Sequence, residues 1–328
     1  MAMSKNNPTA LILAAGKGTR MKSALPKVLH PLLGKPLLRH VIDLLDNIGV
    51  NDIIVVVGHG AQMVKSEFSN DDCEFVIQEE QLGTGHAVMC AEQSLKKREG
   101  DLLILCGDTP LFTHKTLTRF IREHQDANNE LSILSAAFSD PTGYGRILRD
   151  EHRDFLGIVE EKDATNEQRS IQEVNTGVYL VKIPLLCQLI TKLSCNNAQG
   201  EFYLTDTVEL ARQKGHKVGA FCLATEEEAL GVNSRSQLAD AEAILLNRIR
   251  SRHMDRGVTL SMPSTIYIED TVSIDNDVTI CPNCILAGQT VIGQGAKIGA
   301  FSYLENADIP SGANVPPYTQ VINGKYLK

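Results

Sequence analysis

A loop of small residues followed by two cations, close to the N-terminus, has the composition of a phosphate-binding site. The segment Leu13-Ala14-Ala15-Gly16 ends an apolar run, and Arg20 and Lys27 follow it. Small residues let a backbone approach a ligand closely, and successive N–H groups in such a loop bind anions. Arg and Lys add charge-assisted hydrogen bonds to phosphate. The sequence therefore predicts that this segment binds a polyphosphate.

The charge distribution favours the same interpretation. The first 42 residues contain seven cations and no Asp or Glu, whereas the whole chain has a formal net charge of −8. The opening segment is therefore a local positive region in an acidic chain. Its cations are Lys5, Lys17, Arg20, Lys22, Lys27, Lys35 and Arg39.

Two other glycine-rich phosphate loops do not fit this segment. A dinucleotide fingerprint needs glycine where Met21 stands, and Gly16 lacks the Walker spacing to a Gly-Lys-Ser/Thr group. From the residues alone, an ordinary turn with surface lysines is the remaining alternative.

Two later segments carry polar groups at the ends of predicted strands. Gln78 offers a donor and an acceptor, as recognition of uracil requires, and Gly83-Thr84-Gly85 permits close backbone approach and capping of a helix. Gly107-Asp108 follows the apolar run 101–105. A carboxylate there fits Mg²⁺, which takes one or two protein oxygens together with phosphates and waters. Taken alone, these residues are also typical of capped turns.

Between positions 139 and 235 three further residues stand at or near the ends of predicted strands, and a fourth precedes the predicted helix 236–256. Polar groups fixed on neighbouring strand ends form pockets that orient a sugar, although each group singly is typical of a solvated loop. Asn233 is also an ordinary N-cap candidate. The four residues are Gly145, Glu160, Asn175 and Asn233.

The elements that must position these residues alternate in type from residue 9 to residue 138. Such alternation is typical of a parallel sheet covered by helices on both faces, with ligands at the carboxyl ends of the strands. Apolar runs predict strands at 9–13, 52–57, 74–77, 101–105 and 131–137, and helical spacing predicts helices at 37–48, 61–68, 84–95 and 114–124. The alternation breaks between residues 139 and 200, and Thr205 or Asp206 predicts the start of a further helix.

The chain changes character after residue 235. Residues 236–256 have apolar side chains at helical spacing and predict a connecting helix. From residue 257 to 328, apolar residues recur every six positions, which is typical of a parallel β-helix. These residues are Ile268, Ile274, Ile280, Leu286, Ile292, Ile298 and Leu304. The predicted domains are therefore 1–235, the linker 236–256, and 257–328.

Together these motifs resemble the sugar-nucleotide pyrophosphorylases, and among them the bacterial N-acetylglucosamine-1-phosphate uridyltransferases. The resemblance implies an α/β fold: a Rossmann-like nucleotidyltransferase domain with a mixed sheet, followed by a short left-handed parallel β-helix of hexapeptide repeats. Where that family often has an aromatic residue, this chain has Cys106. In the family, later coils carry an acetyltransferase. This sequence ends at Lys328 before them, so we expect its tail to serve oligomerisation.

The resemblance also assigns roles to the phosphate and metal residues. It implies that Arg20 and Lys27 are catalytic and hold phosphates together with the Leu13–Gly16 backbone. It implies that Asp108 and Asn233 bind Mg²⁺, with Gly107 beside the substrate.

The remaining motifs match the family's base and sugar sites. The matches favour N-acetylglucosamine 1-phosphate over glucose 1-phosphate as the sugar substrate. The residues so assigned are Gln78, Gly83 and Thr84 for uracil, and Gly145, Glu160 and Asn175 for the amino sugar.

The expected activity is the conversion of UTP and N-acetylglucosamine 1-phosphate to UDP-N-acetylglucosamine, a cell-wall precursor, and pyrophosphate. The family implies Mg²⁺ as cofactor and a cytoplasmic homotrimer. Two alternatives remain: a related nucleotidyltransferase with another nucleotide or sugar 1-phosphate, and a non-catalytic module that binds a UDP-sugar.

Composition argues against other classes of protein. The acidic balance and the lack of a basic stripe argue against nucleic-acid binding, and no apolar run approaches the length of a membrane span. The N-terminal residues lack the apolar core of a signal peptide. Eight scattered cysteines fit reduced thiols. The lone pair Cys281 and Cys284 is interpreted as structural, because no metal or redox partners accompany it.

Overall fold

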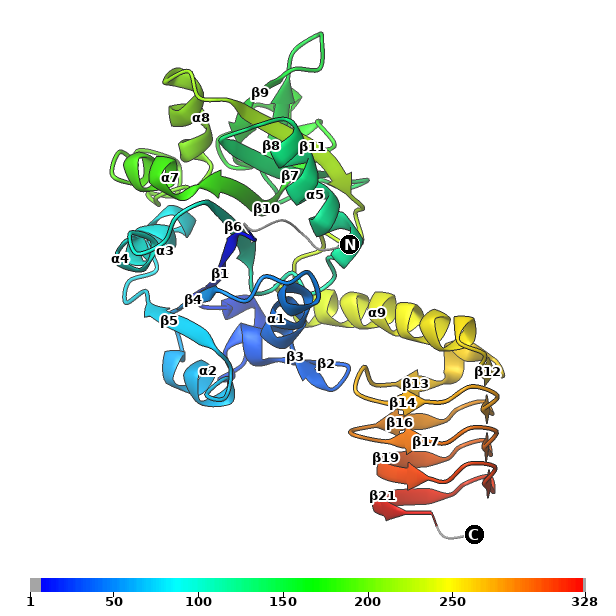
Figure 1. Cartoon of the computed structure of the whole chain (residues 1–328). Coiled ribbons are helices and arrows are strands. Elements are labelled where there is room, and N and C mark those ends of the chain that lie inside the picture. Colours follow the sequence, from blue (N-terminus) through cyan, green and yellow to red (C-terminus); the bar gives the residue numbers. More distant parts are fainter. Residues whose placement is uncertain (1–6, 327–328) are drawn as a thin grey trace. The chain divides into compact units, whose positions relative to one another are not determined.

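The computed structural model describes residues 7–326 of the chain (Figure 1). They form two compact units. One holds the residues up to His30 together with Leu37–Arg235, and the other holds Pro31–Pro36 together with the residues from Ser236 onward. Lys5, one of the predicted cations, lies outside the described residues. Within residues 7–326, no helix has both the length and the apolar composition needed to cross a membrane.

A nine-stranded mixed sheet is the scaffold of the first unit, with the main order β11-β7-β10-β6-β1-β4-β5. Strands β1, β4, β5 and β6 are parallel, whereas β10 is antiparallel to both β6 and β7. The β8–β9 hairpin attaches to β10. The strands are β1 Thr9–Ala14, β4 Ile53–Val57, β5 Cys73–Ile77, β6 Asp101–Cys106, β7 Leu131–Ala137, β8 Arg146–Arg149, β9 Phe155–Val159, β10 Glu173–Lys182 and β11 Val218–Ala224.

Helices cover both faces of this sheet (Figure 1). Successive side chains of a strand point to opposite faces, so Leu11 and Ile12 of β1 are both fully buried but in different cores. One core includes α1, α2 and α5, and the other includes α3, α4, α7 and α8. The helices are α1 Leu37–Asn47, α2 Ala61–Glu67, α3 Thr84–Cys90, α4 Glu92–Leu95, α5 His114–Asp126, α6 Asn166–Arg169, α7 Ile183–Ile190 and α8 Asp206–Gln213.

One local prediction about the first unit was wrong. The helix predicted over 84–95 is interrupted at Ala91, which separates α3 from α4. Within the segment expected to cap this helix, the N-cap residue is Gly83, at φ 107°, and not Thr84. Thr84 Oγ1 instead accepts a hydrogen bond of 3.2 Å from the N–H of Leu204. Thr84 therefore connects its loop to the segment that precedes α8.

The second unit is a left-handed parallel β-helix of hexapeptide repeats. The pairing of Thr259 with Thr279 spans twenty residues. The next coil takes eighteen, since Thr279 pairs with Lys297, and the following one takes seventeen, since Lys297 pairs with Asn314. Its strands are β12 Thr259–Leu260, β13 Tyr267–Ile268, β14 Ser273–Ile274, β15 Thr279–Ile280, β16 Ile285–Ala287, β17 Val291–Ile292, β18 Lys297–Ile298, β19 Tyr303–Ile309, β20 Asn314–Val315 and β21 Gln320–Lys325.

The predicted six-residue period forms the core of this unit. All seven predicted residues are buried; Ile274 is the most exposed of them, at 8%. Helix α9 Arg235–Asp255 contributes Leu246 and Ile249 to the same core. So does Leu33, in the turn of the hairpin formed by β2 Pro31–Leu32 and β3 Lys35–Pro36.

Of the Cys281–Cys284 pair, Cys284 contributes to the β-helix core. All eight cysteines of the chain are free thiols. Cys284 is fully buried in the β-helix core, and its Sγ donates to the carbonyl of Gly299 at 3.2 Å.

Candidate active site

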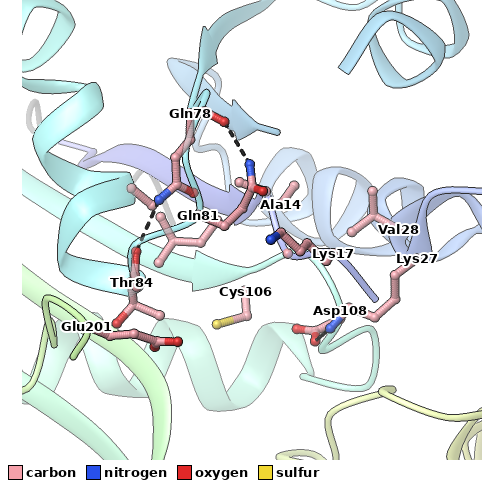
Figure 2. A pocket seen from close by; sticks show the side chains of 15 residues that line it. Ala14, Lys17, Lys27, Val28, Gln78, Gln81, Thr84, Cys106, Asp108 and Glu201 are labelled. Atoms are coloured by element: carbon pink, nitrogen blue, oxygen red, sulfur yellow. Dashed lines mark hydrogen bonds and ion pairs between the residues drawn. The ribbon is translucent and has the colours of Figure 1, made fainter. Parts of the chain in front are cut away.

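A cavity of about 430 Å³ lies at the carboxyl ends of β1 and β6 (Figure 2). Ligands of parallel sheets bind at this edge, because the loops that follow the strands meet there. Nine of the predicted site residues line the cavity, and they come from four separate segments. These residues are Leu13, Ala14, Ala15, Gly16, Lys27, Gln78, Gly83, Thr84 and Asp108.

Gly16 and Gly107 lack a side chain for different reasons. A Cβ on Gly16 would meet no other atom within 4 Å, and the residue is exposed in the cavity wall. A Cβ on Gly107 would lie 3.2 Å from the Cβ of Ala14 and 3.3 Å from Cγ1 of Val28. Gly16 therefore leaves room for a ligand, whereas Gly107 lets the chain after β6 pack against the end of β1 and against Val28.

Ion pairs neutralise part of the predicted positive region. In the first unit Lys27 pairs with Asp108, and Arg39 pairs with Asp71 at 2.5 Å. In the second unit Lys35 pairs with Asp270 at 2.8 Å. The acidic partners come from distant parts of the sequence, so counting charges along the first 42 residues overstates the local potential.

The cations in and near the cavity differ in position. Lys17 is exposed and lines the cavity. Arg20 is exposed on the 3₁₀ helix Thr19–Met21 and is outside the set of described residues that line the cavity. Lys27 lies on the 3₁₀ helix Lys27–Leu29 and reaches the cavity wall (Figure 2).

The ammonium of Lys27 bridges the two predicted metal ligands. Its Nζ forms an ion pair with Oδ2 of Asp108 and donates to Oδ1 of Asn233 at 2.9 Å. The Lys27 and Asp108 side chains are only 12% and 16% exposed. A carboxylate oxygen and an amide oxygen thus already meet at a single cation.

This donor set fits Mg²⁺, which prefers oxygen ligands and binds through one or two protein groups, waters and substrate phosphates. The described residues contain no group of three or more His, Cys, Asp or Glu side chains that could hold a metal ion by themselves. A metal at Asp108 and Asn233 would therefore depend on the substrate for further ligands.

The loop after β5 places Gln78 in the cavity wall with its amide held in one orientation. The Gln78 side chain is 3% exposed. Its Nε2 donates to the carbonyl of Gly83 at 3.2 Å and lies 3.0 Å from Nδ1 of His86. Gln81 Nε2 donates to the backbone carbonyl of Gln78 at 3.0 Å (Figure 2). Gly83 must be glycine, since a Cβ would lie 2.6 Å from the carbonyl oxygen of Phe202.

The three predicted sugar residues lie together beside β10. The N–H of Asn175 donates to the carbonyl of Gly145 at 2.8 Å, and a Cβ on Gly145 would lie 3.4 Å from Oε2 of Glu160. Thr205 Oγ1 donates to Oε1 of Glu160 at 3.0 Å, and Asn175 Nδ2 donates to the Tyr179 hydroxyl at 2.7 Å. The turn before β8, the end of β9 and the strand β10 thus meet at one place.

Burial sets the protonation of this cluster. Burial raises the pKa of Glu160, and the hydrogen bond from Thr205 only partly opposes this effect. Burial, followed by the nearby Glu160, raises the pKa of Tyr179 well above its ordinary value. Tyr179 is therefore a neutral hydroxyl in the neutral pH range, able to donate as well as accept.

A β-bulge in β10 determines where Asn175 points. The pairing of β10 with β7 shifts register between Asn175 and Val178. Gly177 adopts φ 78° inside the bulge, and its N–H donates to Oδ1 of Asn175 at 3.1 Å. Thr176 Oγ1 donates to the carbonyl of Leu134 at 2.7 Å. Bulges commonly re-aim side chains next to active sites.

Several cavity residues were missed by the sequence reasoning. Gln81 belongs to the same motif as Gln78, and this position was the only feature of the sequence that indicated a role in the cavity. Glu201 precedes the predicted helix start and gave no signal of its own. The cavity is also lined by Lys17, Val28, Ala87 and Cys106. Burial, followed by the charge of Asp108, raises the pKa of Cys106 to about 12, so its thiol stays protonated.

Comparison with known domains identifies the class of protein. Residues 10–173 match the model of the MobA-like NTP transferase domain, and residues 271–306 match the bacterial transferase hexapeptide (six repeats). The fold and the site therefore define a nucleotidyltransferase with a hexapeptide-repeat domain.

Two solved structures share this fold at low sequence identity. One is a Bacillus anthracis protein described as a glucose-1-phosphate thymidylyltransferase, with a TM-score of 0.57 and 19% identity over 73% of this chain and 95% of that one. The other is HddC from Yersinia pseudotuberculosis, with a TM-score of 0.54 and 22% identity over 73% of this chain and 100% of that one. At these identities the likeness shows the fold alone.

More similar relatives identify the family. The chain is 47% identical to the bifunctional protein GlmU of Caldanaerobacter subterraneus over 93% of this chain and 66% of the relative. It is 45% identical to that of Syntrophotalea carbinolica over 96% and 68%, and 48% identical to that of Clostridium beijerinckii over 93% and 67%. The chain belongs to the GlmU family. It spans about two thirds of the length of these relatives.

Proposed function

We propose that this nucleotidyltransferase transfers the uridylyl group of UTP to N-acetylglucosamine 1-phosphate, which yields UDP-N-acetylglucosamine and pyrophosphate. The observation that carries the proposal is a single cavity that collects the phosphate loop, Gln78 and the Lys27–Asp108 ion pair. Membership of the GlmU family supports the same reaction.

The phosphate side of the cavity aligns the reacting groups. The Leu13–Gly16 backbone, Arg20 and Lys27 hold the triphosphate of UTP. A phosphate oxygen of the sugar 1-phosphate attacks the α-phosphorus in line and forms a new P–O bond. The bond from the α-phosphorus to the oxygen that bridges to the β-phosphate breaks, and its electron pair leaves with pyrophosphate. No general base is required, because the nucleophile is already anionic. Catalysis comes from positioning and charge neutralisation.

Asp108 and Asn233 are the residues that would hold Mg²⁺. When bound, the metal supplies neutralisation of the negative charge on the phosphates. Lys27 contacts both of these oxygens and is near enough to the cavity to contact phosphates instead. Its ammonium is a mobile point charge suited to that exchange.

The cluster beside β10 recognises the sugar. Glu160 accepts from sugar hydroxyl or amide groups, and the Asn175 amide and the Gly145 backbone fix the other polar atoms. The bulge in β10 and the hydrogen bond from Thr205 hold these groups in place before the sugar binds. Such fixed polar groups give orientation and specificity.

Replacing Asp108 tests the assignment of the site. We expect Asp108→Ala to lower the rate of pyrophosphate release by about a hundredfold or more, because a residue that would hold the metal, and that also pairs with Lys27, is lost. The matched control is Asp126→Ala, on the exposed side of α5, which should retain the wild-type rate. Circular dichroism would verify that both variants are folded. A near-normal rate in Asp108→Ala would rule out the metal and phosphate role.

A substrate panel separates this function from its alternatives. UTP, CTP, GTP and dTTP would each be combined with glucose 1-phosphate and with N-acetylglucosamine 1-phosphate. A preference for another pair would indicate a related nucleotidyltransferase. Tight binding of UDP-N-acetylglucosamine without pyrophosphate release would indicate a non-catalytic binding module.

We also propose a homotrimer that works in the cytoplasm. Apolar side chains exposed on the β-helix, such as Ile285 and Val291, support association through this unit. The mass in solution should then be three times the chain mass of 35.9 kDa. Eight free thiols support a reducing compartment.

A further inference from the structure

We propose that His86 is a positioning residue that turns Gln78 into an acceptor for the nucleotide base and so favours uracil over cytosine. The inference rests on the proposed function, because it takes the loop after β5 as the base site. His86 lies on α3, outside the set of described residues that line the cavity. Its contact with Gln78 Nε2, 3.0 Å from Nδ1, is the starting observation.

Both amide protons of Gln78 are used inside the protein. A primary amide nitrogen carries two N–H donors. One points to the carbonyl of Gly83, at 3.2 Å, and the other to Nδ1 of His86. Neither contact involves the amide oxygen. Because Gln78 lines the cavity with a side chain that is 3% exposed, that oxygen is the amide atom available to a ligand.

The two partners of the amide fix its orientation. The carbonyl of Gly83 can only accept, so the nitrogen of Gln78 must face it. A flipped amide would place its oxygen against the carbonyl oxygen of Gly83 and against the lone pair of Nδ1. This orientation requires the neutral His86 tautomer with its proton on Nε2.

The ring of His86 is itself held in place. Its Nε2 lies 4.0 Å from Sγ of Cys90, one helical turn further along α3. The ring of Phe202 packs beside it, with ring centroids 6.2 Å apart. The acceptor Nδ1 is therefore presented to Gln78 by groups outside the cavity lining.

An acceptor in this position discriminates between the two pyrimidines. Uracil presents N3–H, which donates to the Gln78 oxygen. Cytosine presents an unprotonated N3, so two acceptors would face each other. Leaving a desolvated polar group without a partner weakens binding by on the order of tenfold to a hundredfold.

Equilibrium binding of UTP and CTP tests the inference without requiring turnover. We expect His86→Leu to lower the ratio of the CTP to the UTP dissociation constant by about tenfold, since one of the two groups that oppose the amide flip is gone. His86→Asn should restore most of the ratio, because its Oδ1 lies close to the former Nδ1 position and accepts. Lys17→Gln, in the same cavity, should weaken both nucleotides equally.

Two results would overturn the inference. One is a wild-type ratio in folded His86→Leu, and the other is a wild-type protein that does not prefer UTP. Nitrogen-15 NMR of His86 in the wild-type protein is a second measurement, independent of variant folding. It should show the Nε2–H tautomer, and a proton on Nδ1 would also contradict the inference.

The proposed function fails separately from this inference. Wild-type protein that prefers UTP but releases no pyrophosphate with N-acetylglucosamine 1-phosphate would remove the function and leave the role of His86. An active protein in which the ratio of the CTP to the UTP dissociation constant does not depend on His86 would remove the inference and leave the proposed function.

Discussion

At Gly16, the effect of a substitution on ligand binding can be separated most clearly from its effect on stability. Its missing side chain faces open space in the cavity, so Gly16→Ala adds a methyl group that no protein atom opposes. We expect a thermal midpoint close to that of the wild type and UTP affinity reduced by roughly tenfold, because the methyl group occupies room needed by phosphate. Calorimetry and equilibrium binding would measure the two effects.

Gly18 is the matched control for Gly16. It adopts φ 58°, and a Cβ there would lie 2.9 Å from the Cβ of Lys27. Gly18→Ala should therefore destabilise the protein by roughly 1 kcal/mol or more. If Gly16→Ala instead lowered the thermal midpoint as much as Gly18→Ala does, the glycine at position 16 would be needed for folding and not for ligand binding.

Lys27 should compete with a metal ion for Asp108 and Asn233. Two unit charges about 4 Å apart interact by about 4 kcal/mol at an effective dielectric constant of 20, more than the roughly 1.4 kcal/mol of a tenfold change in affinity. We therefore expect Lys27→Gln to bind Mn²⁺ about tenfold more tightly than the wild type when nucleotide is absent. Electron paramagnetic resonance of free Mn²⁺ measures this directly.

Lys17→Gln serves as the control for this competition. Lys17 lines the same cavity, but the Lys27 ammonium is the cation that contacts the two oxygens. Its replacement should change UTP affinity and leave Mn²⁺ affinity alone. Unchanged or weaker Mn²⁺ binding by Lys27→Gln would show that its ammonium does not occupy the metal position.

At the scale of elements, close stacking of the β-helix coils depends on glycine. A Cβ on Gly299 would lie 2.3 Å from the backbone nitrogen of Pro317 and 2.6 Å from the carbonyl carbon of Pro316. Backbone atoms cannot move aside cheaply, so we expect Gly299→Ala to destabilise the second unit by about 1–3 kcal/mol. Denaturant unfolding monitored by circular dichroism would measure the change.

Gly324, in β21, provides the comparison within the same unit. A Cβ there would meet only the carbonyl oxygen of Ile322, at an ordinary 3.8 Å. Gly324→Ala should leave the unfolding midpoint nearly unchanged. Equal midpoints for the two variants would mean that the coils can separate to admit a methyl group.

The elements also show why the sugar site was only partly predictable from the sequence. The alternation up to residue 138 predicted the parallel strands, because apolar periodicity reflects burial. No local pattern predicted that β10 would insert antiparallel between β6 and β7, which is what brings Asn175 near Glu160. Resemblance to a family named these residues, but their meeting point depends on tertiary pairing.

At the scale of the whole molecule, a buried histidine should make stability depend on pH. Burial, followed by Arg252 and Arg256, lowers the pKa of His253 to about 4, although Asp270 opposes this. Both ring nitrogens are buried without a hydrogen-bond partner. Between pH 6.5 and 4 the unfolded chain binds a proton that the folded chain does not. Stability should therefore fall by up to about 3 kcal/mol as pH decreases through this window.

His253→Leu should reduce that slope, and the part that remains belongs to His30, whose pKa is also lowered, by burial and then by Arg235. A carboxyl group such as Asp270 affects stability at lower pH than His253 does. Burial raises the pKa of Asp270, but the ion pairs with Lys35 and Arg252 together outweigh burial and lower this pKa. The stabilisation by Asp270 is therefore lost only below its ordinary pKa of 3.8. Unfolding midpoints measured from pH 7 to 4 would separate the two groups. An unchanged slope in His253→Leu would assign the acid sensitivity elsewhere.

Tertiary ion pairs across the whole molecule also limit how well the local charge can be predicted by counting charged residues along the sequence. Seven cations without an acid predicted a positive cradle, yet Lys27, Lys35 and Arg39 each have a carboxylate partner from a later segment. Likewise, Gln78 was predicted to offer a donor and an acceptor, but folding uses both donors on Gly83 and His86. Residue types predict which chemistry is available, and three-dimensional pairing decides which of it reaches the ligand.

The hairpin Pro31–Pro36 has a consequence for how this protein is made and divided. Leu33 is part of the β-helix core, although the ribosome releases it roughly two hundred residues before the rest of that unit. A gene fragment that begins at Ser236 would encode a β-helix without one of its interior side chains. Anyone expressing the two halves separately would need to graft those six residues onto the later half.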